Sequence, residues 1–364
     1  MKIRAMAGVL VAFLFFSCDQ SPIFYAIYQE VKPKDPRVKG NPTNMAELHE
    51  IMYVASRFGK SVHRYNKEGA WIAAIPSPGG RNLMELVTDG KSLYALAGDP
   101  LGKTEVYVKN DDDAWNVEPI RFDASGVIQT ICGAGDANGG YLFASTEEGL
   151  FSYQTGAESF SSESLLSGLS KEDIVKGAAY MDGIYYVAVV NKGVYTFDGG
   201  LSGEPVDGTA GKPIVGIRAV GDRIVAVSRR PSAGDGSLFY GDSSGFTEVN
   251  KSIAFSGSME IWRNPDNPAQ SLLLVGIQSQ SYSTINGYRE IPLGDDESLD
   301  ANSLDLRTPG VSDVSTVSSA DRYTSTMGLR IATSLYQAPD NTLFASTMKN
   351  GLWSYRNDVW NAEE

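Results

Sequence analysis

The sequence predicts an all-β protein, a seven-bladed β-propeller of four-stranded antiparallel blades, on three observations. The stretch LFASTEEGLFSY at Leu142–Tyr153 returns near the C-terminus as LFASTMKNGLWSY at Leu343–Tyr355. Each copy has two runs of alternating small and apolar residues joined by a short polar turn, which is the pattern of a β-hairpin. Weaker copies fill the rest of the chain at intervals of about 40 to 50 residues, except for about 70 before the last copy, and this spacing is typical of propeller blades.

The second strand of the expected blade occurs seven times. Its copies are Met52–Ser56, Leu93–Ala97, Leu142–Thr146, Tyr185–Val189, Ile224–Ser228, Leu272–Gly276 and Leu343–Thr347. Most copies follow a turn rich in Asp, Asn and Gly, because these residues tolerate the positive φ of tight hairpins. Further apolar runs, such as Ile174–Tyr180 and Ile214–Val220, precede several of the turns and predict the first strand of each blade. The copy within Ser258–Leu293 matches the pattern least.

A third and a fourth strand are expected after the hairpin. The third strand has the form Gly-apolar-aromatic-x-aromatic and occurs at Gly149–Tyr153, Gly193–Phe197 and Gly351–Tyr355, with looser forms at Ser61–Tyr65 and Glu105–Lys109. The fourth is expected to carry a bulky aromatic, which would be Trp71, Trp115, Phe160, Phe246 or Trp360. Neighbouring blades must cover these side chains, and burial of each is worth about 2–3 kcal/mol. A pair of β-sandwiches would not explain one repeated four-strand unit, and a β-solenoid would need shorter repeats.

The composition suits such a domain and disfavours some partners. Of the 364 residues, 42% are hydrophobic, and the 38 glycines fit many turns rather than long helices. The formal charge is −13, and loss of Lys2 and Arg4 with residues 1–17 would make it −15. Nucleic acid and anionic lipid both need a basic surface, so neither is an expected partner.

Residues 1–17 predict a signal peptide, with a basic start and an apolar run too short to span a bilayer. The run ends in Leu14-Phe15-Phe16-Ser17-Cys18, which resembles the relaxed lipoprotein signal of spirochaetes, with Leu14 one place earlier than in the usual bacterial box. The resemblance implies cleavage before Cys18 and attachment of fatty acyl chains such as palmitate to it, so that lipid alone would anchor the protein to a membrane. The alternative is an ordinary secretory signal with an incidental cysteine.

Residues 18–43 are expected to form the lipidated N-terminus and a linker, ahead of a propeller at 44–364. Ser21–Glu30 is typical of an extra strand, whereas Lys32–Thr43 is rich in proline and predicts a semi-rigid linker. The stretch at about 294–330 joins an acidic run to a segment rich in Ser and Thr. It predicts an outer strand with a long loop or an ordered insertion, and it is the candidate contact surface because long loops often carry function.

The histidines predict no catalytic or metal site. His49 and His63 are the only two in the chain, and neither lies in a metal-binding or triad motif. His63 takes the place that Phe151, Tyr195 and Trp353 hold in other copies, so we interpret it as a structural substitute for an aromatic residue.

Other reactive groups are interpreted in the same way. With Cys18 lipidated, Cys132 has no partner for an intramolecular disulfide, and its apolar surroundings predict a small buried core residue rather than a reactive thiol. Asp111-Asp112-Asp113 and the run Asp295–Asp300 offer carboxylates that calcium favours, but the first lacks the spacing of a calcium loop and is interpreted as an exposed turn. Gly133–Gly140 lies in a hairpin turn and lacks the helix start of a phosphate loop. No catalytic, cofactor or metal residue is therefore assigned.

The repeats resemble the seven-bladed propellers of many bacterial envelope proteins, in pattern rather than in a diagnostic motif. Together with the signal at Cys18, this resemblance implies an exported, lipid-anchored binding or scaffolding module whose partner is an envelope protein or an extracellular ligand. A scaffold like the propeller lipoprotein of the outer-membrane barrel-assembly machinery is a looser parallel, since that family has eight blades. The alternative is a carbohydrate-active enzyme, a hydrolase or lyase, with carboxylates or tyrosines at the channel mouth. The outer membrane or cell surface is the favoured location, and the periplasmic face is the alternative.

Overall fold

The protein is described by a computed structural model. It covers residues 37–38, 40–99, 102–109, 114–229, 236–251, 253–265, 271–278, 287–294, 296–299, 331–348, 351–356 and 359–363. Cys18, the predicted signal peptide, Asp111–Asp113 and most of the predicted insertion at 294–330 lie outside these residues.

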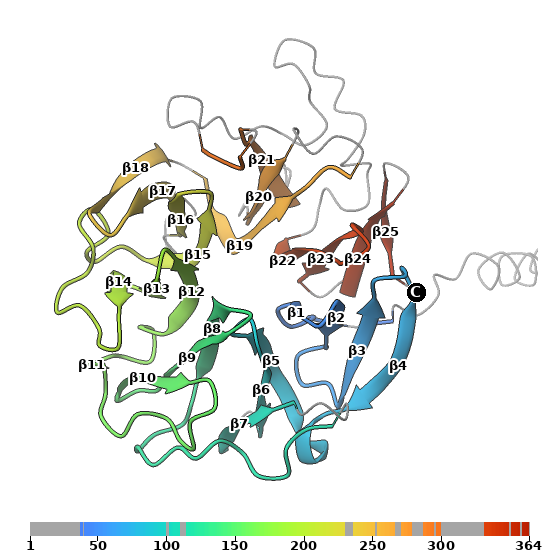
Figure 1. Ribbon diagram of the computed structural model, residues 1–364, viewed down its shortest axis with the longest axis horizontal. Coiled ribbons are helices and arrows are strands. Elements are labelled where there is room, and N and C mark those ends of the chain that lie inside the picture. The colour runs from blue at the N-terminus through green and yellow to red at the C-terminus, as the bar shows by residue number, and fades with distance from the viewer. Residues whose placement is uncertain are drawn as a thin grey trace, which may run out of the picture. The chain divides into compact units, whose positions relative to one another are not determined.

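Seven antiparallel sheets stand in a ring, one for each predicted repeat (Figure 1). The strands of each sheet are consecutive in the chain. Blade 1 holds β1 (Ala46–Leu48), β2 (Ile51–Val54), β3 (Ser61–Asn66) and β4 (Trp71–Pro76); blade 2 holds β5 (Asn82–Thr88), β6 (Leu93–Gly98) and β7 (Thr104–Val108). Blade 3 holds β8 (Thr130–Asp136), β9 (Gly139–Ser145), β10 (Gly149–Gln154) and β11 (Leu166–Ser167); blade 4 holds β12 (Val175–Met181), β13 (Ile184–Val189) and β14 (Gly193–Phe197).

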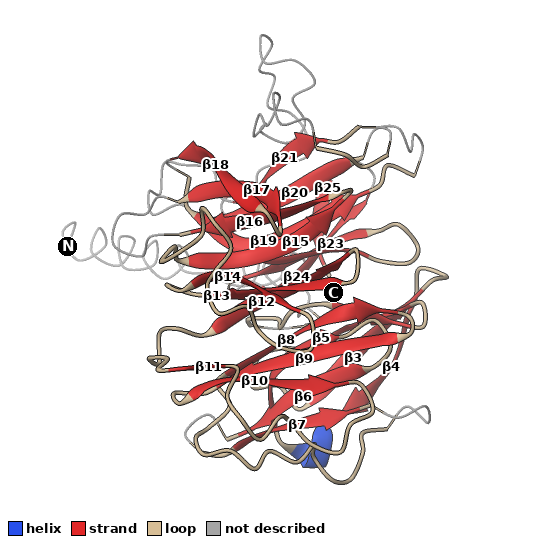
Figure 2. Cartoon of the chain, turned by 60° about the vertical axis from the view of Figure 1, so that its left-hand side comes forward, coloured by secondary structure: helices blue, strands red, loops and turns tan. Residues whose placement is uncertain are grey.

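The second half of the ring follows the same order. Blade 5 holds β15 (Ile214–Val220), β16 (Arg223–Ser228), β17 (Ser237–Asp242) and β18 (Gly245–Lys251); blade 6 holds β19 (Phe255–Trp262), β20 (Leu272–Ile277) and β21 (Gly287–Pro292). Blade 7 holds β22 (Ala332–Gln337), β23 (Leu343–Thr347), β24 (Gly351–Arg356) and β25 (Val359–Ala362). The described residues contain one helix, a single 3-10 turn at Pro78–Gly80, and the rest of the fold is strand and loop (Figure 2).

The predicted propeller is confirmed, and the second and third strands lie where the repeats placed them. The strand register also supports the place given to His63 within its blade. His63 pairs with Val54, just as Phe151 pairs with Ala144 and Trp353 with Ala345. Its ring packs edge-on against Trp71, with centroids 6.5 Å apart, so it takes an aromatic position.

The fourth strands match the prediction only in part. Trp71, Phe246 and Trp360 lie on β4, β18 and β25 as expected. Trp115 forms only an isolated bridge with Lys109, because the outer segment of blade 2 bonds to β7 irregularly. The prediction that Phe160 lies on a strand is wrong. Phe160 lies in a loop before β11 and packs its ring against Phe122.

The cores lie between neighbouring blades. At the closure of the ring, Phe344 of blade 7 packs edge-on against Tyr65 and Trp71 of blade 1, with centroids 4.9 Å and 5.9 Å away. The hydroxyl of Tyr65 also donates to Asp340 at 2.6 Å. Because no described strand crosses from one blade to the other, side chains carry most of this closure.

The segment just before blade 1 takes part in the same closure. The backbone N–H of Arg37 donates to the carbonyl of Glu363 at 2.8 Å, and Val38 is fully buried among the residues of blades 1 and 7. Residues 37–43, which the sequence assigned to the linker, therefore include contacts of the folded ring.

Candidate functional site

The innermost strands of all seven blades surround one cavity of about 550 Å³ at the centre of the ring. Its wall comprises residues 44–47, 85–88, 130–133, 176–178, 215–218, 229, 256–260 and 333–336. These segments belong to or adjoin β1, β5, β8, β12, β15, β19 and β22, in chain order. We call this cavity the channel.

Local irregularities shape the channel wall. The register of the first strand shifts against the second in five blades, at Leu83/Glu85, Val175/Gly177, Ile214/Gly216, Phe255/Met259 and Ala332/Ser334. A β-bulge of this kind re-aims side chains, and bulges are frequent beside functional sites. The shifted residues include Lys176 and Thr333, which line the channel. The shifts lie near the beginning of each innermost strand, which we call the strand-start end of the channel.

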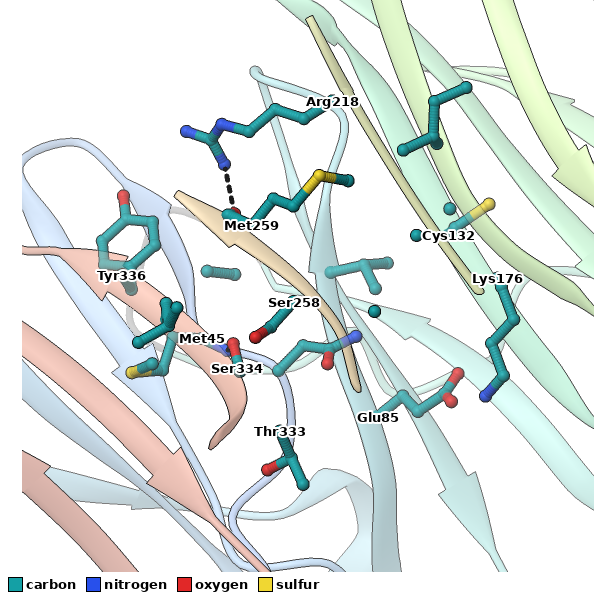
Figure 3. Close-up of a pocket in the computed structure, with 18 of the residues that line it drawn as sticks. Met45, Glu85, Cys132, Lys176, Arg218, Ser258, Met259, Thr333, Ser334 and Tyr336 are labelled. Carbon is teal, nitrogen blue, oxygen red and sulfur yellow. Dashed lines mark hydrogen bonds between the residues drawn. The ribbon is translucent and has the colours of Figure 1, made fainter. Parts of the chain in front are cut away.

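At the other end of these strands, the strand-finish end, a charged cluster joins blades 5 and 6. Arg218 donates to Glu260 at 2.7 Å and to the carbonyl of Met259 at 3.2 Å (Figure 3). The side chain of Arg218 is 33% exposed, whereas that of Glu260 is 5% exposed. Arg218 is therefore partly accessible from the channel, whereas Glu260 is buried.

Glu260 occupies a position that other blades fill with apolar side chains. It pairs with Leu274 of the second strand. The equivalent residues, judged from the register, are Leu86, Ile131, Ala178, Ile217 and Leu335. Burial raises the pKa of Glu260 to about 7, although the charge of Arg218 acts in the opposite direction. Its Oε2 is buried and has no hydrogen-bond partner among the residues that the structure describes.

Tyr336 of blade 7 belongs to the same end of the channel. Its hydroxyl donates to Oε2 of Glu47 in blade 1 at 2.5 Å. Burial, with the negative charge of Glu47, raises the pKa of Tyr336 well above its usual range. The phenol therefore stays protonated at neutral pH and acts as a hydrogen-bond donor.

The strand-start end carries a different set of charges. The carboxylate of Glu85 accepts from the hydroxyl of Thr130 at 2.9 Å and from the backbone N–H of Ile131 at 2.8 Å, so the protein already satisfies it. Lys176 is exposed, and its side chain lies on the same side of the cavity as Glu85 (Figure 3). Arg229 follows β16 and donates to the side-chain oxygen of Gln278. Burial lowers the pKa of Arg229.

Hydroxyl groups share the remaining wall with apolar side chains such as Leu86 and Ile131. Ser256 and Ser258 lie 3.3 Å apart through their hydroxyl oxygens, and Ser258 donates to the carbonyl of Ala332 at 3.2 Å. Ser334 accepts from the backbone N–H of Met45 at 3.5 Å. A wall of hydroxyls and charges suits a polar ligand better than an apolar one.

Of the cysteine and the two histidines considered in the sequence analysis, only Cys132 lies in the channel wall. Cys132 lines it but is 7% exposed, and burial raises the pKa of its thiol, which favours the unreactive protonated form. His49 is exposed and His63 lies on β3, and neither is in the channel wall. Among the described residues, no three His, Cys, Asp or Glu side chains are placed to hold a metal ion.

Sequence reasoning did not identify Lys176, Arg218, Arg229 or Glu260 as site residues. Two of them lie inside the apolar runs that predicted first strands, Lys176 in Ile174–Tyr180 and Arg218 in Ile214–Val220. A charge inside such a run was the available signal, because the first strand of a propeller blade faces the channel. No helix in the described part of the chain has the length and hydrophobicity of a membrane span.

No known protein-family model matches the chain, and no curated protein matches it in sequence. Among solved structures, a GH74 enzyme from Niastella koreensis is similar with a TM-score of 0.61 and 14% identity, over 90% of this chain and 55% of that one. A streptogramin B lyase is similar with a TM-score of 0.55 and 8% identity, over 88% of this chain and 94% of that one. The virginiamycin B lyase from Staphylococcus aureus is similar with a TM-score of 0.52 and 10% identity, over 86% of this chain and 94% of that one. At these identities the likeness establishes the propeller fold alone.

Proposed function

We propose that this protein is a lipid-anchored, exported binding module of the cell envelope, and that its ligand is held in the channel. The observation that carries the proposal is the channel wall itself. All seven blades contribute to it, and it adds charged and hydroxyl side chains to the apolar ones that it shares with the interfaces between blades. A concave site with a few convergent polar groups is the usual form of a ligand site.

The anchoring part of the proposal rests on the signal that ends at Cys18. Replacement Cys18→Ser is expected to abolish labelling of the protein by radioactive palmitate in growing cells and to release the propeller from the membrane fraction. Retention of the label after this replacement would contradict the lipid attachment. Protease treatment of intact cells then distinguishes a surface location, in which the propeller is digested, from a periplasmic one.

The channel part is tested by photo-crosslinking in whole envelopes. A photoreactive amino acid replaces Thr333, which lines the channel, and in a second variant replaces Lys171, which is exposed on the approach to β12 and does not line it. We expect adducts from position 333 that position 171 does not give. Adducts from position 171 alone would place the partner on the outer surface, and adducts from neither would contradict a binding role.

A carbohydrate-active enzyme is the second candidate, and Glu260 favours it. A carboxyl group with a pKa near 7 inside a cavity is suited to general acid–base chemistry, and the Tyr336 phenol lies in the same cluster. The GH74 enzyme shares the fold but lends no site residue. Release of reducing ends from envelope or host polysaccharides, lost in Glu260→Gln, would support the enzyme. No release from any of them would favour the binding module.

A further inference from the structure

Within the described residues, Lys176 and Arg229 are two cations of the channel wall that have no acidic partner. Lys176 and Arg229 line the same cavity, from blades 4 and 5. Neither forms an ion pair with any residue of the described ranges, and the only side-chain bond of Arg229 goes to the neutral amide of Gln278. In the same region, two partly buried lysines are paired: Lys192 lies 3.4 Å from Asp173 and Lys212 lies 3.0 Å from Glu248. The channel cations are therefore exceptions to the pattern around them.

The backbone fixes where Arg229 lies. Its N–H donates to the carbonyl of Pro213 at 3.1 Å, which holds the residue beside the beginning of β15. Gln278 accepts the hydrogen bond from the guanidinium of Arg229. Its own backbone N–H donates to the carbonyl of Ala254, just before blade 6 begins. Arg229 thus bridges two blades at the strand-start end. A guanidinium carries five N–H donors, so one bond to Gln278 leaves donors for another group.

Burial without a counter-ion is costly for a cation, and the lowered pKa of Arg229 expresses this cost. A bound anion would remove it. The carboxylate that lines the same end, Glu85, already accepts two hydrogen bonds from blade 3 and lies beyond ion-pair distance of Lys176 within the described structure. The fold therefore does not neutralise these cations from within.

Small residues let blades 5 and 6 approach closely in the channel wall. A Cβ on Gly216 would lie 2.0 Å from the carbonyl oxygen of Gly257, so only glycine permits this approach of blades 5 and 6. Beside it, Ser256 and Ser258 line the wall with short side chains; Ser258 donates to Ala332, and the hydroxyl of Ser256 can turn from Ser258 toward an oxygen acceptor. Two cations and the Ser256 hydroxyl, from neighbouring blades, form the donor set of an oxyanion site.

We propose that the strand-start end of the channel binds the oxyanion group, a carboxylate or a phosphate, of a small polar solute through Lys176 and Arg229. This inference rests on the proposed binding role of the channel and adds the chemical class of its ligand. The acidic chain as a whole repels anions, since its formal charge is −13, so an anion that binds must be held by this local pair.

The test is titration calorimetry of the detergent-solubilised full chain with inorganic phosphate and, separately, with citrate, in a chloride buffer. We expect one site per chain for at least one of the two, with affinity that falls as salt rises. Preference for phosphate or for citrate tells which group the site takes. Lys176→Gln and Arg229→Gln should each weaken binding about tenfold or more, as loss of a charge-assisted bond does.

Lys171→Gln is the matched control, because it removes an exposed lysine of the same region outside the channel, and it should change the affinity less than about twofold. Absence of saturable binding of both anions overturns the inference, as does equal weakening by Lys171→Gln and Lys176→Gln. Lys176 is exposed, so its variant is expected to fold even if Arg229→Gln does not. If position 333 crosslinks in envelopes but neither anion binds, the oxyanion inference fails and the channel proposal stands.

Discussion

The interfaces between blades and the channel that they surround use the same seven innermost strands in opposite ways. At the interfaces, residues such as Leu83, Ile214 and Phe255 are buried and apolar. In the channel, Lys176, Arg218 and Glu85 come from equivalent strands but differ from blade to blade. The repeat therefore preserves the apolar side chains that hold the ring together. The charged positions of the channel wall differ from blade to blade and can contact a ligand.

The largest expected effect lies at the interface that closes the ring. Phe344→Ala removes a fully buried ring that contacts Tyr65 and Trp71, and should lower the free energy of unfolding by about 3–5 kcal/mol. Urea unfolding followed by tryptophan fluorescence measures the change. Phe344→Leu keeps most of the apolar volume and should cost clearly less. Equal, small effects of both variants would mean that this closure does not hold the ring.

Glu260 is an exception to this division, because it is a buried carboxyl group at a position that other blades fill with apolar side chains. Its pKa is raised from 4.5 to about 7, so the folded protein binds a proton there more tightly than the unfolded chain does. The resulting stability is fully present below about pH 4.5 and is lost as the pH rises through 7, by up to about 3 kcal/mol. Glu260→Gln should therefore flatten the fall in stability between pH 5 and about 8.

Thermal unfolding over this pH range measures the effect. Glu147→Gln, at an exposed position outside the channel, is the control and should keep the slope of the wild type. A Glu260→Gln protein with an unchanged slope would show that another group carries the pH dependence.

A smaller effect is expected at Thr130, whose hydroxyl donates to the carboxylate of Glu85 in the channel wall. Thr130→Val removes the hydroxyl that donates to Glu85 and leaves the bond from the Ile131 backbone in place. The expected loss of stability is about 1–2 kcal/mol, because one bond to a charged group is lost without creation of a cavity. Urea unfolding of Thr130→Val beside Thr130→Ser separates the hydroxyl from the side-chain volume. No loss in Thr130→Val would mean that water replaces the hydroxyl.

The sequence predicted much of the fold for a physical reason. The second strands are buried on both sides, as in Leu343–Thr347, so their small and apolar residues recur in every blade. The outer strands face solvent and tolerate variation, and Phe160 could be buried from a loop as well as from a strand. The channel residues were not predicted, because bulges at Lys176 and Thr333 set their directions and a bulge leaves no regular spacing in the sequence.

The division of roles between interface and channel is tested most directly by one pair of measurements on Lys176→Gln. Its thermal midpoint and its affinity for phosphate or citrate are measured in the same preparation, beside wild type. We expect a midpoint within about 1 °C of wild type, because an exposed lysine is replaced, together with loss of anion affinity. A lowered midpoint with unchanged affinity would contradict this division of roles, since Lys176 would then support the ring rather than a ligand.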